Sequence, residues 1–163
     1  MTGQAGDPYF SWPLRVYYQH TDAGGVVFHA NYLSFMECAR TELLQSQGFD
    51  LGELARKDRI LFVVHSAQIA YHKPALLNDL LTVTAQVKRL PVTAVSTPAS
   101  SGTITGCLMS KAMGRARLQF DQAVMRREEV LASAELSLAC VSAKSYRPVA
   151  VPEAIRKKLE ELR

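Results

Sequence analysis

One stretch decides the fold: Asn31-Tyr-Leu-Ser-Phe-Met-Glu-Cys-Ala-Arg-Thr-Glu-Leu-Leu-Gln-Ser-Gln47. Apolar side chains recur in it at steps of three or four residues, which is the period of an α-helix. They form a broad stripe made of Tyr32, Leu33, Phe35, Met36, Ala39, Leu43 and Leu44. Asn31 suits the N-cap position and Gly48 suits a helix end. We therefore expect one helix over residues 31–47, with an apolar face broad enough to require a covering layer.

The segments around this helix show the two-residue alternation of strands that bury one face. Residues 81–88 alternate strictly, and the same pattern returns on both sides of the charged run Arg126-Arg-Glu-Glu129. That run is a natural hairpin turn and predicts antiparallel pairing of the two strands beside it. The expected strands cover residues 12–18, 60–72, 81–88, 116–121 and 133–140.

The order of these elements predicts an α+β fold. After the last strand, Pro152 precedes a short amphipathic pattern in which Ile155, Leu159 and Leu162 share one face of a C-terminal helix. A long apolar helix followed by an antiparallel sheet packs most economically when the sheet wraps around the helix. We therefore expect a hotdog arrangement, with the sheet enclosing the long helix and a short helix closing the chain.

Length and composition fit a single domain. The chain has 163 residues, of which 48% are hydrophobic and 21% charged, enough to bury a substantial core. We expect the hotdog domain to span residues 12–163, after a flexible start at residues 1–11. Residues 90–113 show no sustained period and have a middle rich in Ser, Thr, Pro and Gly, which predicts a flexible insertion.

Charge and patterning narrow the classes of partner. The net charge of +4 suits an anionic partner, but only 8% of the residues are aromatic and no long Lys/Arg block occurs. A phosphate-bearing small molecule therefore fits better than nucleic acid. No signal peptide pattern and no apolar run of roughly 18 residues is present, so we expect a cytoplasmic protein without an integral membrane segment. The cysteines, Cys38, Cys107 and Cys140, lack metal spacing and are expected to be reduced, with no metal site.

Asp22 is the candidate catalytic residue. It precedes the turn sequence Ala-Gly-Gly25 and lies shortly before the expected helix. A carboxylate can attack a carbonyl or activate water, and unpaired N–H groups at a helix start can hold the negative charge that develops on the carbonyl oxygen. Together these groups suit an activated ester such as a thioester better than an amide. Sequence motifs of phosphate loops, zinc proteases and serine hydrolases are missing.

The same residues also have purely structural interpretations. An Asp before Gly often closes a turn by accepting from its own backbone, so the pattern alone leaves both interpretations of Asp22 open. A single His near a turn is more often structural than catalytic, and we expect this of the imidazoles of His20 and His29. Any role of His29 in catalysis is expected through its backbone N–H, close to the helix start.

The sequence resembles the 4-hydroxybenzoyl-CoA thioesterase family. The resemblance rests on Arg15-Val-Tyr-Tyr-Gln-His-Thr-Asp-Ala-Gly-Gly-Val-Val-Phe-His-Ala-Asn-Tyr-Leu-Ser-Phe-Met-Glu-Cys-Ala-Arg-Thr-Glu42 and continues in Phe62-Val-Val and Tyr71-His-Lys-Pro-Ala. It is strongest to the YbgC-type acyl-CoA thioesterases of that family, which are associated with the Tol-Pal cluster. The resemblance implies hydrolysis of acyl-CoA without a cofactor, with Asp22 as catalytic carboxylate and the backbone N–H of His29 holding the carbonyl.

The resemblance also implies substrate contacts and assembly. Substrate-binding residues would be Gly25, Tyr32, Lys88 and Arg115, the last two toward the CoA phosphates, although solvated strand-end charge is the simpler interpretation of both cations. A homodimer or homotetramer is expected, with the acyl pocket at a subunit interface. Acyl carrier protein is an alternative acyl donor.

Two other functions stay open at this point. A hotdog dehydratase would need a His and an acid facing each other across the pocket, and the helix offers no strong pair of this kind. A non-catalytic scaffold that binds acyl carriers for lipid synthesis is compatible with the basic charge. Product analysis separates these functions, because only hydrolysis releases a free thiol.

Overall fold

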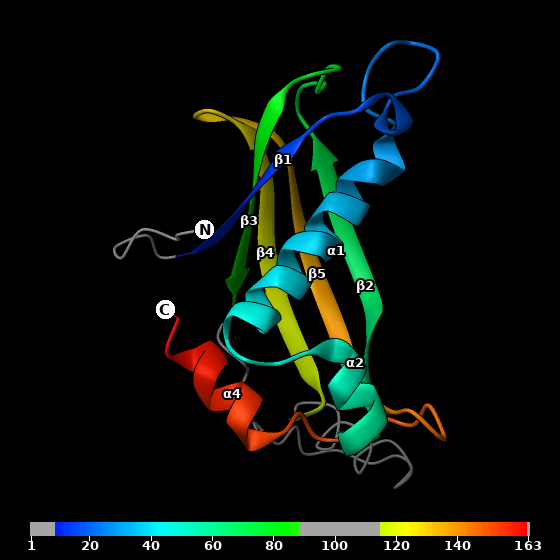
Figure 1. Cartoon of the computed structure of the whole chain (residues 1–163), viewed down its shortest axis with the longest axis vertical. Coiled ribbons are helices and arrows are strands. Elements are labelled where there is room, and N and C mark those ends of the chain that lie inside the picture. The colour runs from blue at the N-terminus through cyan, green and yellow to red at the C-terminus, as the bar shows by residue number, and fades with distance from the viewer. Residues whose placement is uncertain (1–8, 89–114, 163) are drawn as a thin grey trace, which may run out of the picture.

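Within residues 9–88 and 115–162, which this computed structural model describes, five antiparallel strands form one sheet (Figure 1). Their spatial order is β1 (Phe10–Arg15), β3 (Leu80–Val87), β4 (Arg117–Arg126), β5 (Glu129–Ser142) and β2 (Ile60–Tyr71). The sheet curves around the long helix α1 (His29–Ser46), so the predicted α+β hotdog arrangement is confirmed. The expectations for residues 1–8, for the 90–113 insertion and for Cys107 lie outside the described residues.

Helix α1 buries most of the predicted stripe. Its buried apolar residues are Tyr32, Phe35, Met36, Ala39, Leu43 and Leu44. The helix begins at His29, earlier than expected, with Phe28 in the N-cap position, so the prediction of Asn31 as N-cap is wrong. The Asn31 side chain instead donates through Nδ2 to the His20 carbonyl at 2.8 Å. At the other end, Gly48 has φ +85°, a left-handed conformation that suits glycine and ends the helix as expected.

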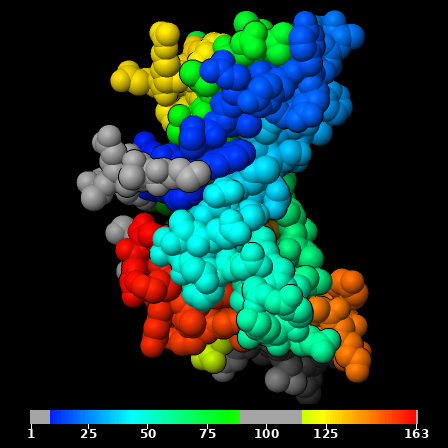
Figure 2. Space-filling view, viewed as in Figure 1, coloured from blue at the N-terminus to red at the C-terminus, as the bar shows by residue number. Residues whose placement is uncertain are grey.

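The inner face of the sheet supplies the other half of the core. Its buried residues on β4 and β5 include Leu118, Phe120, Val124, Leu136, Leu138 and Cys140. In the space-filling view, the cyan surface of α1 faces the viewer, with the blue surface of β1 above it and green surface of β2 beside it (Figure 2). Strand β2 forms an edge of the sheet, and Val63 and Val64 on it are 39% and 53% exposed.

A buried polar contact joins α1 to the sheet. Arg40 on α1 is 5% exposed, and its Nη1 donates to Oε1 of Gln122 on β4 at 2.6 Å. The Gln122 amide nitrogen in turn donates to the carbonyls of Met36, at 3.0 Å, and Thr84, at 3.2 Å. Burial lowers the pKa of the Arg40 guanidinium from its usual value. Because buried polar groups are costly when unpaired, this network fixes how the helix sits on the sheet.

Several strand boundaries differ from the sequence-based predictions. Strands β4 and β5 extend to Arg126 and from Glu129, so they are longer than the expected 116–121 and 133–140 and meet in a tighter hairpin turn. The first strand was expected over residues 12–18, but β1 starts at Phe10 and ends at Arg15, which pairs with Leu80, the first residue of β3. Beyond Arg15 the strand has no partner in β3, and the chain turns into the short 3₁₀ helix η1 (Tyr18–His20). The aromatic residues Tyr17 and Tyr18 therefore predicted a strand at positions that lie beyond the end of the β1–β3 pairing.

The connection after α1 and the end of the chain are both helical. Helix α2 (Leu51–Glu53) and the π-helical turn η2 (Leu54–Asp58) occupy the connection before β2, and the Asp50 side chain caps α2. The C-terminal helix α4 (Glu153–Glu160) buries Ile155 and Leu159, as expected. Leu162 lies beyond the end of this helix and is 37% exposed, so its predicted place on the buried face is wrong. No helix among the described residues is both long and apolar enough to span a membrane.

Candidate active site

Asp22 lies in a small hairpin between η1 and α1. Thr21 and Val27 form an antiparallel bridge, and the Asp22 N–H donates to the Val26 carbonyl at 2.9 Å. Oδ1 of Asp22 accepts from the Gly24 N–H at 2.8 Å, so the turn interaction expected of an Asp before Gly is present. Gly25 has φ +75°, which a residue with a side chain adopts only with strain. The structural interpretation of Asp22 is thus correct, and it also gives the exposed carboxylate a defined orientation.

The start of α1 presents backbone donors without a side-chain cap. Phe28 occupies the N-cap position and contributes no side-chain hydrogen bond to the first turn. An uncapped helix start carries unsatisfied N–H groups and partial positive charge, to which His29 and Ala30 contribute their amides. His29 itself is exposed, and its imidazole packs against Phe28 with ring centroids 4.2 Å apart. An anion or a polarised carbonyl oxygen would be stabilised at this helix end.

The carbonyl of His20 connects the Asp22 hairpin to the helix start. It accepts from the Phe28 N–H at 2.9 Å and from the Asn31 side chain at 2.8 Å. The His20 ring packs edge-on against Phe35 at a centroid distance of 5.0 Å, and its Nδ1 accepts from the Tyr17 N–H at 3.0 Å. Burial lowers the pKa of this imidazole, as suits a neutral structural residue.

Tyr32 lies one turn into α1 and beside an open cavity. The residue is 3% exposed, and its hydroxyl accepts from the Ala75 N–H at 2.9 Å. Burial raises the pKa of the Tyr32 hydroxyl, which keeps it protonated. The cavity has a volume of about 280 Å³ and is lined by Val27, His29, Tyr32, Tyr71, His72, Lys73 and Pro74. A small acyl or pantetheine group could enter here next to the helix start.

The structure does not bring Lys88 and Arg115 to Asp22 within one chain. Lys88 follows the eight-residue strand β3, whose first residue pairs with the last residue of β1. At about 3.3 Å per residue, Lys88 is therefore roughly 26 Å along the sheet from the end at which Asp22 lies. Its ammonium group pairs with Asp121 at 2.9 Å and Glu135 at 3.0 Å. Arg115 lies beside α4, where its carbonyl accepts from the Val151 N–H at 3.0 Å.

Phe35, Met36 and Phe62, which could line an acyl pocket but are more simply interpreted as core residues, belong to the core. Phe35 and Met36 are 4% and 0% exposed, and Phe62 packs against the core from β2. None of the three lines the cavity beside His29. The described residues also contain no group of three or more His, Cys, Asp or Glu side chains that could hold a metal ion.

Comparisons with known proteins identify the family of this chain. A family model described as "Thioesterase superfamily" matches residues 24–94. The acyl-CoA thioesterase YbgC of Haemophilus influenzae is 36% identical over 94% of this chain and 96% of its own. The acyl-CoA thioester hydrolase YbgC of Escherichia coli O6:H1 is 34% identical, covering 90% of this chain and 92% of its own. This chain belongs to the thioesterase superfamily.

Solved structures of the superfamily agree with the fold. The crystal structure of a probable thioesterase from Bartonella henselae superposes with a TM-score of 0.71 at 28% identity, covering 88% of this chain and 99% of the other. Together with the sequence relatives, this likeness makes the protein a thioester hydrolase. The Asp22 hairpin and the uncapped helix start lie in or next to the segment that the superfamily model matches.

Sequence reasoning assigned no role to four residues that line the cavity of this thioesterase. Tyr71, His72, Lys73 and Pro74 follow one another at the end of β2, and the Tyr71 hydroxyl donates to the His29 carbonyl at 2.9 Å. Their stretch, Tyr71-His-Lys-Pro-Ala, belonged to the family resemblance, which was the available indication of function. The contact with His29 spans 42 positions in the sequence, so no local pattern could reveal it.

Proposed function

We propose that this thioester hydrolase cleaves acyl-CoA, with Asp22 as its catalytic carboxylate and the N–H groups of His29 and its neighbours as donors to the carbonyl oxygen. The observation that carries the proposal is the double hydrogen bond at the His20 carbonyl, which ties the Asp22 hairpin to the uncapped start of α1. A carboxylate and a helix start held in one unit are the two groups that thioester hydrolysis needs.

The chemistry follows from the charges that develop. Either Asp22 attacks the thioester carbonyl and forms an anhydride that water then cleaves, or Asp22 removes a proton from the water that attacks. Both routes break the C–S bond, release the thiol after protonation of its sulfur, and place negative charge on the carbonyl oxygen. The amides at the start of α1 would stabilise that charge. Since Oδ1 of Asp22 accepts from Gly24, Oδ2 is the oxygen proposed to act.

Acyl-CoA is the proposed substrate class for two reasons. The cavity beside His29 has apolar walls from Val27, Tyr32 and Tyr71, and Lys73, whose ammonium group pairs with Glu129, also lines it. Two relatives with matches over nine-tenths of this chain are named as enzymes that act on acyl-CoA. Gly25 would keep the hairpin tightly turned beside the substrate, and Tyr32 would form part of the cavity wall.

We further propose that the complete site forms in a homodimer or larger homo-oligomer. Strand β2 runs from Ile60, at the end of the sheet near Arg115, to Tyr71, beside the cavity. Antiparallel pairing of two β2 edges would bring the Ile60 end of one chain to the Tyr71 end of the other. This pairing would bring Arg115 of one chain toward the cavity of its partner, a route to CoA phosphates that a single chain does not provide. Lys88 lies level with Ser66, near the middle of β2, so it gains less from the pairing.

Asp22→Asn tests the catalytic role. The amide oxygen of Asn can still accept from Gly24, so the variant should keep its fold and its melting temperature. Without a carboxylate, kcat should fall about a hundred- to ten-thousandfold in a thiol-release assay. Asp58→Asn, a matched change at an exposed site, should leave kcat unchanged. A folded Asp22→Asn enzyme with near-wild-type kcat would end the assignment.

A substrate panel tests the reaction itself. Butanoyl-CoA, dodecanoyl-CoA, benzoyl-CoA and dodecanoyl-acyl carrier protein cover short, long, aromatic and protein-bound acyl groups. Release of free thiol from at least one CoA ester supports the proposal, and the ranking of kcat/KM identifies the acyl class. Appearance of a double bond in an unchanged thioester would mean dehydration, and binding of the carrier without thiol release would mean a scaffold.

A further inference from the structure

A turn over residues 75–79, far from Asp22 in sequence, supports the Asp22 hairpin. Val26 and Leu76 form an antiparallel bridge, and the Val27 N–H donates to the Ala75 carbonyl at 2.9 Å. Val26 and Val27 form the strand of the hairpin opposite Thr21 and Asp22. The position of the carboxylate therefore depends on where the 75–79 turn lies.

The same turn also contacts the start of α1. The N–H of Ala75, a residue with 0% exposure, donates to the Tyr32 hydroxyl at 2.9 Å. One turn thus contacts both groups of the proposed site, the hairpin that carries Asp22 and the helix that supplies the amides. A shift of this turn would change the distance between them.

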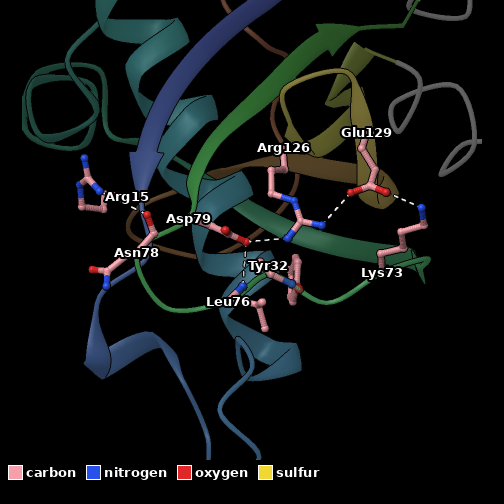
Figure 3. Close-up of polar contacts among 9 residues, drawn as sticks. Arg15, Tyr32, Lys73, Leu76, Asn78, Asp79, Arg126 and Glu129 are labelled. Atoms are coloured by element: carbon pink, nitrogen blue, oxygen red, sulfur yellow. Dashed lines mark hydrogen bonds and ion pairs between the residues drawn. The ribbon is translucent and has the colours of Figure 1, made fainter.

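An ion-pair cluster fixes the 75–79 turn (Figure 3). Oδ2 of Asp79 accepts from the Leu76 N–H at 2.9 Å and from Nη1 of Arg126 at 2.8 Å. Nη2 of Arg126 donates to Glu129 at 2.7 Å, and Glu129 also pairs with Lys73. The Asp79 and Arg126 side chains are 19% and 31% exposed, so solvent screens their interaction less than that of a surface pair.

Arg126 suits this function because of its geometry. Its planar guanidinium group contacts Asp79 and Glu129 with two different nitrogens, which holds the turn against the β4–β5 hairpin. Arg126 and Asp79 are 47 positions apart in the sequence, so the ion pair is a long-range contact. The Asp79 side chain reaches the site through the turn, whose Ala75 contacts the Val27 N–H and the Tyr32 hydroxyl, and neither Asp79 nor Arg126 lines the cavity beside His29. Arg126 is also linked to the cavity wall through Glu129, which pairs with Lys73.

We propose that Arg126 and Asp79 are positioning residues of the thioesterase site, whose ion pair holds the 75–79 turn and through it the distance between Asp22 and the start of α1. The proposal rests on the proposed catalytic role of Asp22. A displacement of reacting groups by about 1 Å can cost on the order of a hundredfold in rate, so loss of the pair acts on catalysis more than on substrate binding.

Kinetics of charge-removing variants test the proposal on the most active acyl-CoA among butanoyl-, dodecanoyl- and benzoyl-CoA. Asp79→Asn and Arg126→Gln should each lower kcat about ten- to a hundredfold with little change in KM, and the double variant should lose no more than either single variant. Arg126→Lys, which keeps the charge but not the two-nitrogen contact, should recover part of the loss. Lys158→Gln, which breaks the Lys158–Glu161 pair on α4, should leave kcat unchanged.

Amide hydrogen exchange gives a readout that does not depend on activity. In an Asp22→Asn background, the amides of Leu76 and Val27 should exchange faster once Asp79 is changed to Asn or Arg126 to Gln, while amides in α4 should not. Unchanged exchange at Val27, or unchanged kcat in folded variants, would overturn the positioning role. If Asp22→Asn alone kept its kcat, the proposed function would fail, and the exchange result would still decide whether the turn is held by this pair.

Discussion

The Tyr32 side chain both supports the fold and lines the cavity of the proposed site. Its buried hydroxyl accepts from Ala75, and no acceptor for its own proton lies among the described residues. Because burial raises the pKa of this hydroxyl, it keeps its proton. The residue therefore serves both the support of the 75–79 turn and the wall of the proposed acyl site.

Tyr32→Phe should be destabilising despite the small change in volume. Removing the hydroxyl leaves the buried Ala75 N–H without its acceptor, which typically costs about 1–3 kcal/mol of unfolding free energy. Urea unfolding measures the loss directly. Tyr18→Phe is the control, because Tyr18 is 80% exposed and its change should stay within about 0.5 kcal/mol. Equal stability of the two variants would show that the Tyr32–Ala75 contact contributes nothing.

At the scale of residues, part of the proposed site could be grouped from the sequence. Asp22, the turn at Gly25 and the donors near His29 lie close together in the chain, so local turn and helix chemistry was enough to group them. The contributions of Ala75, Asp79 and Arg126 could not be predicted. Their contacts join positions 43 to 47 residues apart, and an Asp and an Arg in unrelated segments have no pattern that pairs them.

At the scale of elements, the β4–β5 hairpin is linked by ion pairs to the residues that follow β2. Glu129 opens β5 and faces two cations, Lys73 after β2 and Arg126 at the end of β4. Hydrogen bonds from Lys73, and next from Arg126, lower the pKa of the Glu129 carboxyl below its ordinary value. The charged form is thus favoured in the folded state, and the hairpin is linked to the end of β2.

This lowered pKa predicts acid sensitivity. The stabilisation by Glu129 is complete above the unfolded-state value of about 4.3 and is lost as pH falls through the lower folded-state value. Between about pH 6 and about pH 3, the urea midpoint of wild type should therefore fall more than that of Glu129→Gln. Glu128→Gln removes the neighbouring carboxylate without touching Lys73 or Arg126, and it should follow wild type. Parallel curves for all three proteins would contradict the prediction.

The elements were more predictable than their ends. The long helix, the later strands and the β4–β5 hairpin follow from periodicity, because burial of one face imposes the same period on sequence and structure. The boundary errors arise where tertiary pairing decides. Strand β1 ends at Arg15, which pairs with the first residue of β3. Helix α1 starts at His29, and the side chain of Asn31, the residue expected to cap it, donates to the His20 carbonyl. Neither partner is visible in the local sequence.

On the scale of the whole molecule, the exposed edge at β2 predicts the state of assembly. Val63 and Val64 on this strand are exposed, and no strand among the described residues pairs with its outer edge, which favours pairing with a second copy. The wild-type chain of 18.0 kDa should elute from a sizing column at the mass of a dimer or a higher oligomer. Val63→Lys/Val64→Lys should yield folded monomer with reduced kcat/KM. Leu80→Lys, at an exposed apolar position outside β2, should assemble normally. A monomeric wild type would refute the proposed assembly.

Proline occurs in one of the two edge strands and not in the other, and this difference limits how further copies can pair with the sheet. Strand β1 contains Pro13, which has no N–H to donate, whereas the twelve residues of β2 include no proline. Prolines on an outer strand blunt it against further pairing. When two copies join through β2, each uses the proline-free edge of the sheet that its described residues form, and the outer edges of the joined sheet, as far as the structure describes it, are then both β1. Growth by this route closes at an isologous pair and cannot propagate into a filament.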